Sequence, residues 1–138
     1  MKQRVCLSVL MAWGAITAEL AQAHHSFAMF DGNRVVVLHG TMLSFSYINP
    51  HSWISIVVPP GTDTPEGRWD IEATSPAMLA RDGIRSDTLK AGDKLLVVIR
   101  PLRDGRRGGS LVLLVDSTGK RYGAKPEDVG LRGEDLHP

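Results

Sequence analysis

Residues 34–48 read RVVVLHGTMLSFSYI, and this stretch decides the fold. β-Branched and aromatic side chains dominate it, both alternating sets are apolar at one end, and Gly40 interrupts the middle. Side chains alternate between the two faces of a strand, and a glycine inside a strand often marks a tight bend in a barrel. The stretch therefore predicts one long strand that bends at Gly40.

Further strand patterns follow along the chain, and turn signals separate them. Ser75 and Pro76 are suited to the start of a short helix between the third and fourth strands, and Gly83 is placed to end it. The remaining strands are expected at residues 53–58 (WISIVV), 68–74 (RWDIEAT), 94–100 (KLLVVIR) and 110–116 (SLVLLVD).

Five strands with one short helix after the third predict an all-β protein. Their order matches a small five-stranded OB-like Greek-key barrel. An open β-sandwich built from the same strands is the alternative. We expect a single barrel domain over residues 24–122, followed by a flexible polar C-terminal tail over residues 123–138, where little is available to bury.

The first residues have the three parts of a secretory signal peptide. Lys2 and Arg4 give the positive start, an apolar run follows, and Ala21-Gln22-Ala23 has the small-x-small pattern of a cleavage site. The apolar run is shorter than the roughly 20 residues that span a bilayer. We therefore expect residues 1–23 to be a signal peptide cut between Ala23 and His24, with no permanent membrane anchor.

Cleavage changes the composition in two informative ways. The single cysteine, Cys6, would leave with the signal, so the exported domain must be held together by its core and not by disulfides. Lys2, Arg4 and Glu19 would leave as well, which takes the formal net charge from +1 to zero. Zero net charge gives no support for nucleic-acid binding.

A series of motifs runs through most of the chain. They are HHSFAMFD (24–31), NPHSW (49–53), WDIEATSPAMLARDGI (69–84), LKAGDKLLVVIRPLRDGRRGG (89–109) and the final strand. Together they resemble a family of small exported bacterial proteins, the domain of unknown function 6152. The resemblance covers roughly residues 24–122 and implies an exported Gram-negative protein, but it assigns no activity and no site residue. This chain departs from the family pattern at Gly83-Ile84, where glycine followed by tryptophan is expected.

The histidine pair after the cleavage site is a candidate metal site. Once His24 is the amino terminus, its α-amine and its imidazole Nδ1 can chelate one metal ion. A third nitrogen from a distant histidine would complete a T-shaped copper site. Imidazole-rich sites suit copper, zinc or nickel, and copper(II) binds most tightly. We expect His24, His25 and His51 as ligands, with a solvated tail as the alternative to a site at the terminus.

His51 lies in the Asn49–Ser52 turn, beside Trp53. Asparagine, histidine and serine in a turn commonly bond nearby backbone groups, so a structural role competes with the ligand role. His39, inside the first strand beside Gly40, is expected to be structural.

Arg103, Arg106 and Arg107 form a basic patch in the fourth connection. In OB barrels the first and fourth connections flank one binding face, so this loop is expected to converge with the turn that holds His51. The basic loop and the turn that holds His51 would then together bind a protein partner or an anionic polymer. A solvated hairpin tip is the alternative.

No catalytic arrangement is legible in the sequence. The exported chain would lack cysteine, and no serine is flanked by glycines in a nucleophile elbow. Asp70 and Glu72 share one face of a strand, which more often marks a solvated face than an acid–base pair. The sequence therefore predicts a non-catalytic protein.

Together these features predict a periplasmic binding or accessory domain that holds copper, or alternatively zinc or nickel, through the processed His24. The alternative is an OB-type interaction module that uses the turn at His51 and the loop at Arg106. The expected partner is another periplasmic or inner-membrane protein.

Overall fold

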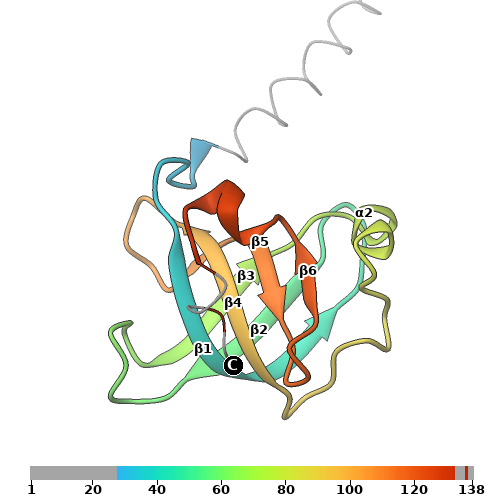
Figure 1. The fold of residues 1–138 in the computed structure, drawn as a ribbon, viewed down its shortest axis with the longest axis horizontal. Helices are drawn as coiled ribbons and strands as arrows, with labels where there is room; N and C mark the ends of the chain where they lie inside the picture. Colours follow the sequence, from blue (N-terminus) through green and yellow to red (C-terminus); the bar gives the residue numbers. More distant parts are fainter. Residues whose placement is uncertain (1–27, 133–135, 137–138) are drawn as a thin grey trace, which may run out of the picture. The chain divides into compact units, whose positions relative to one another are not determined.

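Strand β1 (Val36–Ser46) pairs with two different neighbours in the computed structural model, which describes residues 28–132 and Leu136. Its first half pairs antiparallel with β4 (Lys94–Pro101), and its second half pairs antiparallel with β2 (Trp53–Val58). Thr41 takes part in both pairings. Figure 1 shows the strand curving across the sheet. The prediction of one long strand through Gly40 is confirmed.

Gly40 directly precedes Thr41, the residue that pairs with both neighbouring strands. The space at Gly40 is too small for a side chain. A Cβ atom at Gly40 would lie 2.9 Å from Cδ1 of Ile56 and 2.9 Å from the carbonyl oxygen of Val57. Both distances are shorter than a Cβ atom tolerates. Glycine is therefore needed for the close approach of β1 to β2.

A parallel pairing closes the sheet. The strand order is β3-β2-β1-β4-β5-β6, and β3 (Gly67–Glu72) also pairs with β5 (Gly108–Val115). The short strand β6 (Arg121–Gly123) extends the sheet beside β5. Five strands therefore form a closed barrel in the cyclic order 1-2-3-5-4, which is the connectivity of an OB-type Greek key. The predicted barrel is confirmed, and the β3–β5 pairing rules out the open sandwich.

Helix α2 (Pro76–Arg81) connects β3 to β4, as predicted. Ser75 precedes it in an extended conformation, but its hydroxyl makes no capping hydrogen bond. Instead its carbonyl oxygen accepts from the backbone N–H groups of Met78 and Leu79. Gly83, with φ of +89°, follows the helix where the sequence placed the stop. In the described part of the chain, no helix is long and apolar enough to cross a membrane.

The barrel interior is filled by the inward-facing residues of all five strands, with residues from α2 and the segment after it. Ile84, which follows Gly83 after the helix, is buried in this core. The largest fully buried aliphatic side chains of the interior are Leu38, Ile54, Ile56, Ile71, Leu79, Ile84, Leu95, Ile99 and Leu114.

A second apolar cluster covers the outer surface of β4 and β5. Both alternating sets of β4 are apolar, so one set fills the barrel and the other, Leu96 and Val98, needs a separate cover. The segment after Tyr122 supplies part of it. A loosely ordered polar tail was expected here. The structure has a 3₁₀ helix η1 (Pro126–Val129) in this segment, and the side chain of Leu136 is buried in the outer cluster.

The barrel lies entirely within the unit that begins at Asp31. The expected signal peptide, residues 1–23, lies outside the described residues.

Candidate functional site

The outward face of β1, β2 and β3 carries an exposed apolar group. Trp53 is 42% exposed, Leu43 is 43% exposed and Val57 is 36% exposed. Trp53 and Val57 alternate with the inward-facing Ile54 and Ile56 of the same strand. Leu43 is the extra residue of a β-bulge in β1, since Met42 and Ser44 pair with consecutive residues of β2.

Charged side chains of β3 lie beside this apolar group. The antiparallel register of the three strands sets them in rows across the face. From β1 to β3 the rows are Ser46, Trp53 and Glu72; Ser44, Ser55 and Asp70; and Thr41, Val57 and Arg68. We call this surface the β1–β2–β3 face, defined by Leu43, Trp53, Val57, Arg68, Asp70 and Glu72.

Asp70 is fixed as a charged group in the middle of the face. The Ser55 hydroxyl donates to Asp70 Oδ1 at 2.5 Å, and Arg68 Nε donates to the same oxygen at 3.0 Å. Burial acts to raise the pKa of Asp70, but the hydrogen bonds from Ser55 and Arg68 outweigh it and hold the pKa below its usual value. An ionised carboxylate that already accepts from a hydroxyl and a guanidinium group is poorly placed for proton transfer.

His51 contacts the other carboxylate of β3. Its Nδ1 lies against Oε1 of Glu72, whose side chain is largely buried, while the imidazole is about 41% exposed. A carboxylate on Nδ1 orients the ring and directs Nε2 away from Glu72. The two candidate acid–base residues of the sequence thus have separate partners, Ser55 and Arg68 for Asp70 and His51 for Glu72.

The turn that holds His51 is anchored by Ser52. The backbone N–H of Ser52 donates to the carbonyl oxygen of Thr74 at 3.1 Å, and its own carbonyl oxygen accepts from Ala73 N–H at 2.8 Å. Ser52 is fully buried. Of the expected side-chain contacts with nearby backbone, the Ser52 hydroxyl makes one by donating to the carbonyl oxygen of Ile48 at 3.4 Å, whereas the His51 imidazole contacts a side chain.

The basic loop borders the same strand from the other side. The carbonyl oxygen of Arg107 accepts from Asp70 N–H at 3.2 Å. The loop therefore contacts β3 at Asp70, two residues before Glu72, which contacts His51. Two of the arginine side chains reach acidic neighbours: Arg106 Nε donates to Asp104 Oδ2 at 2.7 Å, and Arg103 lies 4.0 Å from Asp31. The turn and the loop therefore meet one strand, but their charged side chains have different neighbours.

The proposed metal ligands are only partly described. His24 and His25, with Ala23 before the expected cleavage site, lie outside the described residues. Within residues 28–132 and Leu136, no three histidine, cysteine, aspartate or glutamate side chains are grouped as metal ligands.

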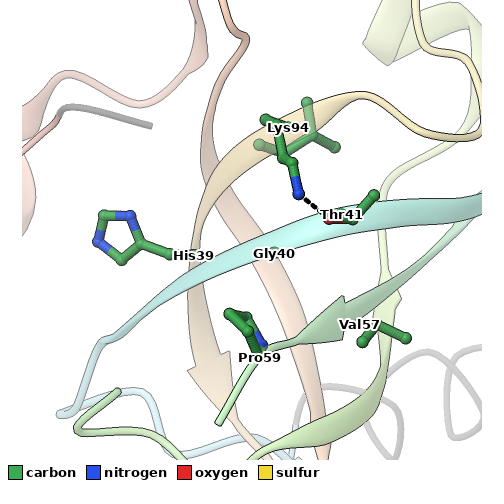
Figure 2. Close-up of a pocket in the computed structure, with 7 residues that line it drawn as sticks. His39, Gly40, Thr41, Val57, Pro59 and Lys94 are labelled. Carbon is green, nitrogen blue, oxygen red and sulfur yellow. Dashed lines mark hydrogen bonds between the residues drawn. The ribbon is translucent and has the colours of Figure 1, made fainter. Parts of the chain in front are cut away.

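A hollow on the barrel surface was not expected from the sequence. It has a volume of about 280 Å³ and is shown in Figure 2. His39, for which a structural role was expected, is exposed and lies at its edge. Alternation alone places His39 and Thr41 on one face of β1, but the contribution of β4 depends on pairing far along the chain. The lining residues are His39, Gly40, Thr41, Val57, Pro59, Lys94 and Leu95.

The fold and this surface define the chain as a small OB-type β-barrel with an exposed mixed face. The chain belongs to a family of unknown function (DUF6152), whose model matches residues 14–111. The resemblance drawn from the sequence motifs is thereby confirmed. No curated protein and no solved structure matches the chain.

Proposed function

We propose that the chain is an exported, non-catalytic binding module that docks a partner protein on its β1–β2–β3 face. The observation that carries the proposal is the exposed tryptophan, Trp53, with Leu43 and Val57 on the same face. Tryptophan is enriched among the residues that dominate protein–protein binding energy, and clustered exposed apolar side chains mark interaction surfaces.

The charge pattern favours a protein over an anionic polymer. Asp70 and Glu72 bring negative charge to the face, and Arg106 is paired with Asp104 inside its own loop. A polyanion would be repelled by the carboxylates and would have to displace this pairing. A protein surface can place donors against Asp70 and an acceptor against Arg68, around an apolar centre.

The proposed location rests on the amino-terminal sequence. Residues 1–23 have the positive start, apolar run and small-x-small end of a cleaved signal peptide. The partner would then be another periplasmic or inner-membrane protein.

Quantitative pull-down from periplasmic extract tests the docking proposal. Trp53→Ala should reduce recovery of the specific partner at least about 10-fold, since a hot-spot tryptophan contributes 2 kcal/mol or more. Met78→Ala is the matched control, because Met78 is 46% exposed but lies on α2. Equal recovery by the Trp53→Ala and Met78→Ala variants would refute the proposal.

A second candidate function, copper binding, is favoured by the contact between His51 and Glu72. Metal-binding histidines commonly hold a carboxylate on the second ring nitrogen, which leaves the other nitrogen for the metal. We propose that Nε2 of His51 joins the α-amine and imidazole of the processed His24, with His25 beside it, to bind copper; zinc or nickel is the alternative.

Copper titration separates this candidate from the first. The mature protein should bind copper at least about 10-fold more tightly than a variant with one extra amino-terminal alanine, because the extension removes the chelating α-amine. His51→Gln should weaken binding in the mature protein and leave the extended variant unchanged. Equal, weak binding by all of these proteins would exclude the copper site.

A further inference from the structure

The surface hollow lies where three strands meet, and its lining combines charge with apolar surface. Lys94, Thr41 and Val57 are cross-strand neighbours on β4, β1 and β2. Gly40 and Leu95 form the adjoining part of the lining, and Pro59 follows the end of β2. Figure 2 shows His39 on the far side of Gly40 from Lys94.

Lys94 carries a positive charge that no described carboxylate neutralises. Its Nζ donates to Oγ1 of Thr41 at 2.7 Å, which holds the ammonium group at the rim of the hollow. Asp93, the next residue along the chain, has Oδ2 occupied by the backbone N–H of Lys90 at 2.8 Å. Arg68 and Arg106, in contrast, are paired with Asp70 and Asp104.

The hydrogen-bond chemistry of the rim suits a carboxylate. Because Oγ1 of Thr41 accepts from Lys94, its own O–H proton is left to donate. An ammonium group and a hydroxyl that donate to one carboxylate form charge-assisted hydrogen bonds. His39 adds a ring nitrogen at the opposite edge.

The rest of the lining limits the ligand further. Val57 and Pro59 give the hollow an apolar wall, which a hydrated inorganic anion would not use. A neighbouring hollow shares His39 but is lined by Asp63, Thr62 and Thr64. The Asp63 carboxylate would repel a second negative group on that side.

We propose that this hollow binds a small organic monocarboxylate, with its carboxylate on Lys94 and Thr41 and its apolar body against Val57 and Pro59. The site is independent of the docking proposal, and its ligand is a small molecule and not a protein. Val57 borders both surfaces, but binding here requires no partner.

Titration of the isolated mature protein, followed by backbone and side-chain NMR, tests the site. Benzoate is the probe, benzamide is its uncharged counterpart, and inorganic phosphate is an anion without an apolar body. Benzoate should shift the resonances of Thr41, Val57 and Lys94, and its affinity should exceed those of benzamide and phosphate at least 5-fold.

Matched lysine variants identify the charge. Lys94→Met keeps most of the side-chain length and should weaken benzoate binding at least 5-fold. Lys90→Met removes an exposed lysine of the turn before β4 and should leave the affinity unchanged. Shifts located elsewhere, no binding of benzoate, equal binding of benzamide or phosphate, or equal effects of the two lysine variants would each overturn the proposal.

Discussion

At the scale of single residues, the absence of a Cβ atom at Gly40 allows β1 to pair with both β4 and β2. The pairing of β1 with β4 and then β2 brings the backbone of β2 to within 2.9 Å of the place where a Cβ would lie. Ile56 can turn aside, but the carbonyl oxygen of Val57 belongs to the sheet and moves only with its strand.

Gly40→Ala should therefore destabilise the barrel by about 1–3 kcal/mol, the usual cost of overpacking a filled site. Urea unfolding of the variant measures the change in the free energy of unfolding. Gly32→Ala is the control, because a Cβ at Gly32 meets nothing within 4 Å. A Gly40→Ala variant as stable as the Gly32→Ala variant would contradict the steric explanation.

Asp116 organises the turn before β6 and makes stability depend on pH. Its Oδ1 accepts from the N–H and hydroxyl of Thr118, and its Oδ2 accepts from the Tyr122 hydroxyl at 2.9 Å. Burial acts to raise the pKa of Asp116, but these hydrogen bonds outweigh it and hold the pKa below its usual value. A lowered folded-state pKa means that the stabilisation is present above about pH 4 and is lost as the pH falls through the folded-state pKa.

Asp116→Asn should lower the free energy of unfolding at pH 7 by about 1 kcal/mol, since it removes the charge that these donors stabilise. The difference from the parent protein should shrink as the pH falls below about 4. Urea unfolding at several pH values measures both effects. A difference that stays constant down to pH 2 would show that the charge of Asp116 contributes nothing.

At the scale of elements, the sequence was sufficient where a strand is long and its pattern is strong. The pattern of residues 53–58 coincides with β2 (Trp53–Val58), and the helix between the third and fourth strands lies where Ser75, Pro76 and Gly83 placed it. Strand β6 has only three residues and gave no pattern. The parallel pairing of β3 with β5 joins distant segments, and no local signal encodes it.

The outer apolar cluster explains why the segment after Tyr122 carries more structure than its composition predicts. Neighbouring residues of β4 face opposite sides and are apolar on both, so the outer side requires a cover. A polar segment with two suitably placed leucines, Leu131 and Leu136, can provide it, and composition averages hide such single residues. Leu136 is 2% exposed in this cluster.

Leu136→Ala should reduce the free energy of unfolding by about 2–3 kcal/mol. This value is at the low end of the usual range for truncating a buried leucine, because the segment can partly collapse onto the cavity that the substitution leaves. Leu43→Ala, at an exposed position of β1, is the matched control and should change it by less than about 1 kcal/mol. Urea unfolding of both variants measures the contrast. Similar losses in the two variants would mean that the cover is not anchored by Leu136.

At the scale of the whole molecule, the barrel presents one face where exposed apolar side chains of β1 and β2 lie beside charged side chains of β3. Alternation along β2 separates Trp53 and Val57 from Ile54 and Ile56, but only the closed barrel decides which set faces inward. The contact between His51 and Glu72 depends on the turn returning to the end of β3, and the pairing of Arg106 with Asp104 depends on loop geometry. These contacts therefore could not be predicted from the sequence.

The central proposal, that a protein docks on the β1–β2–β3 face, is tested most directly by site-specific photo-crosslinking in the periplasm. A photoreactive phenylalanine analogue at position 53 should give a discrete, partner-sized adduct, because Trp53 would be buried in the complex. The same analogue at position 78, on the exposed side of α2, should give none. Absence of an adduct from position 53, or the same adduct from both positions, would contradict the proposal.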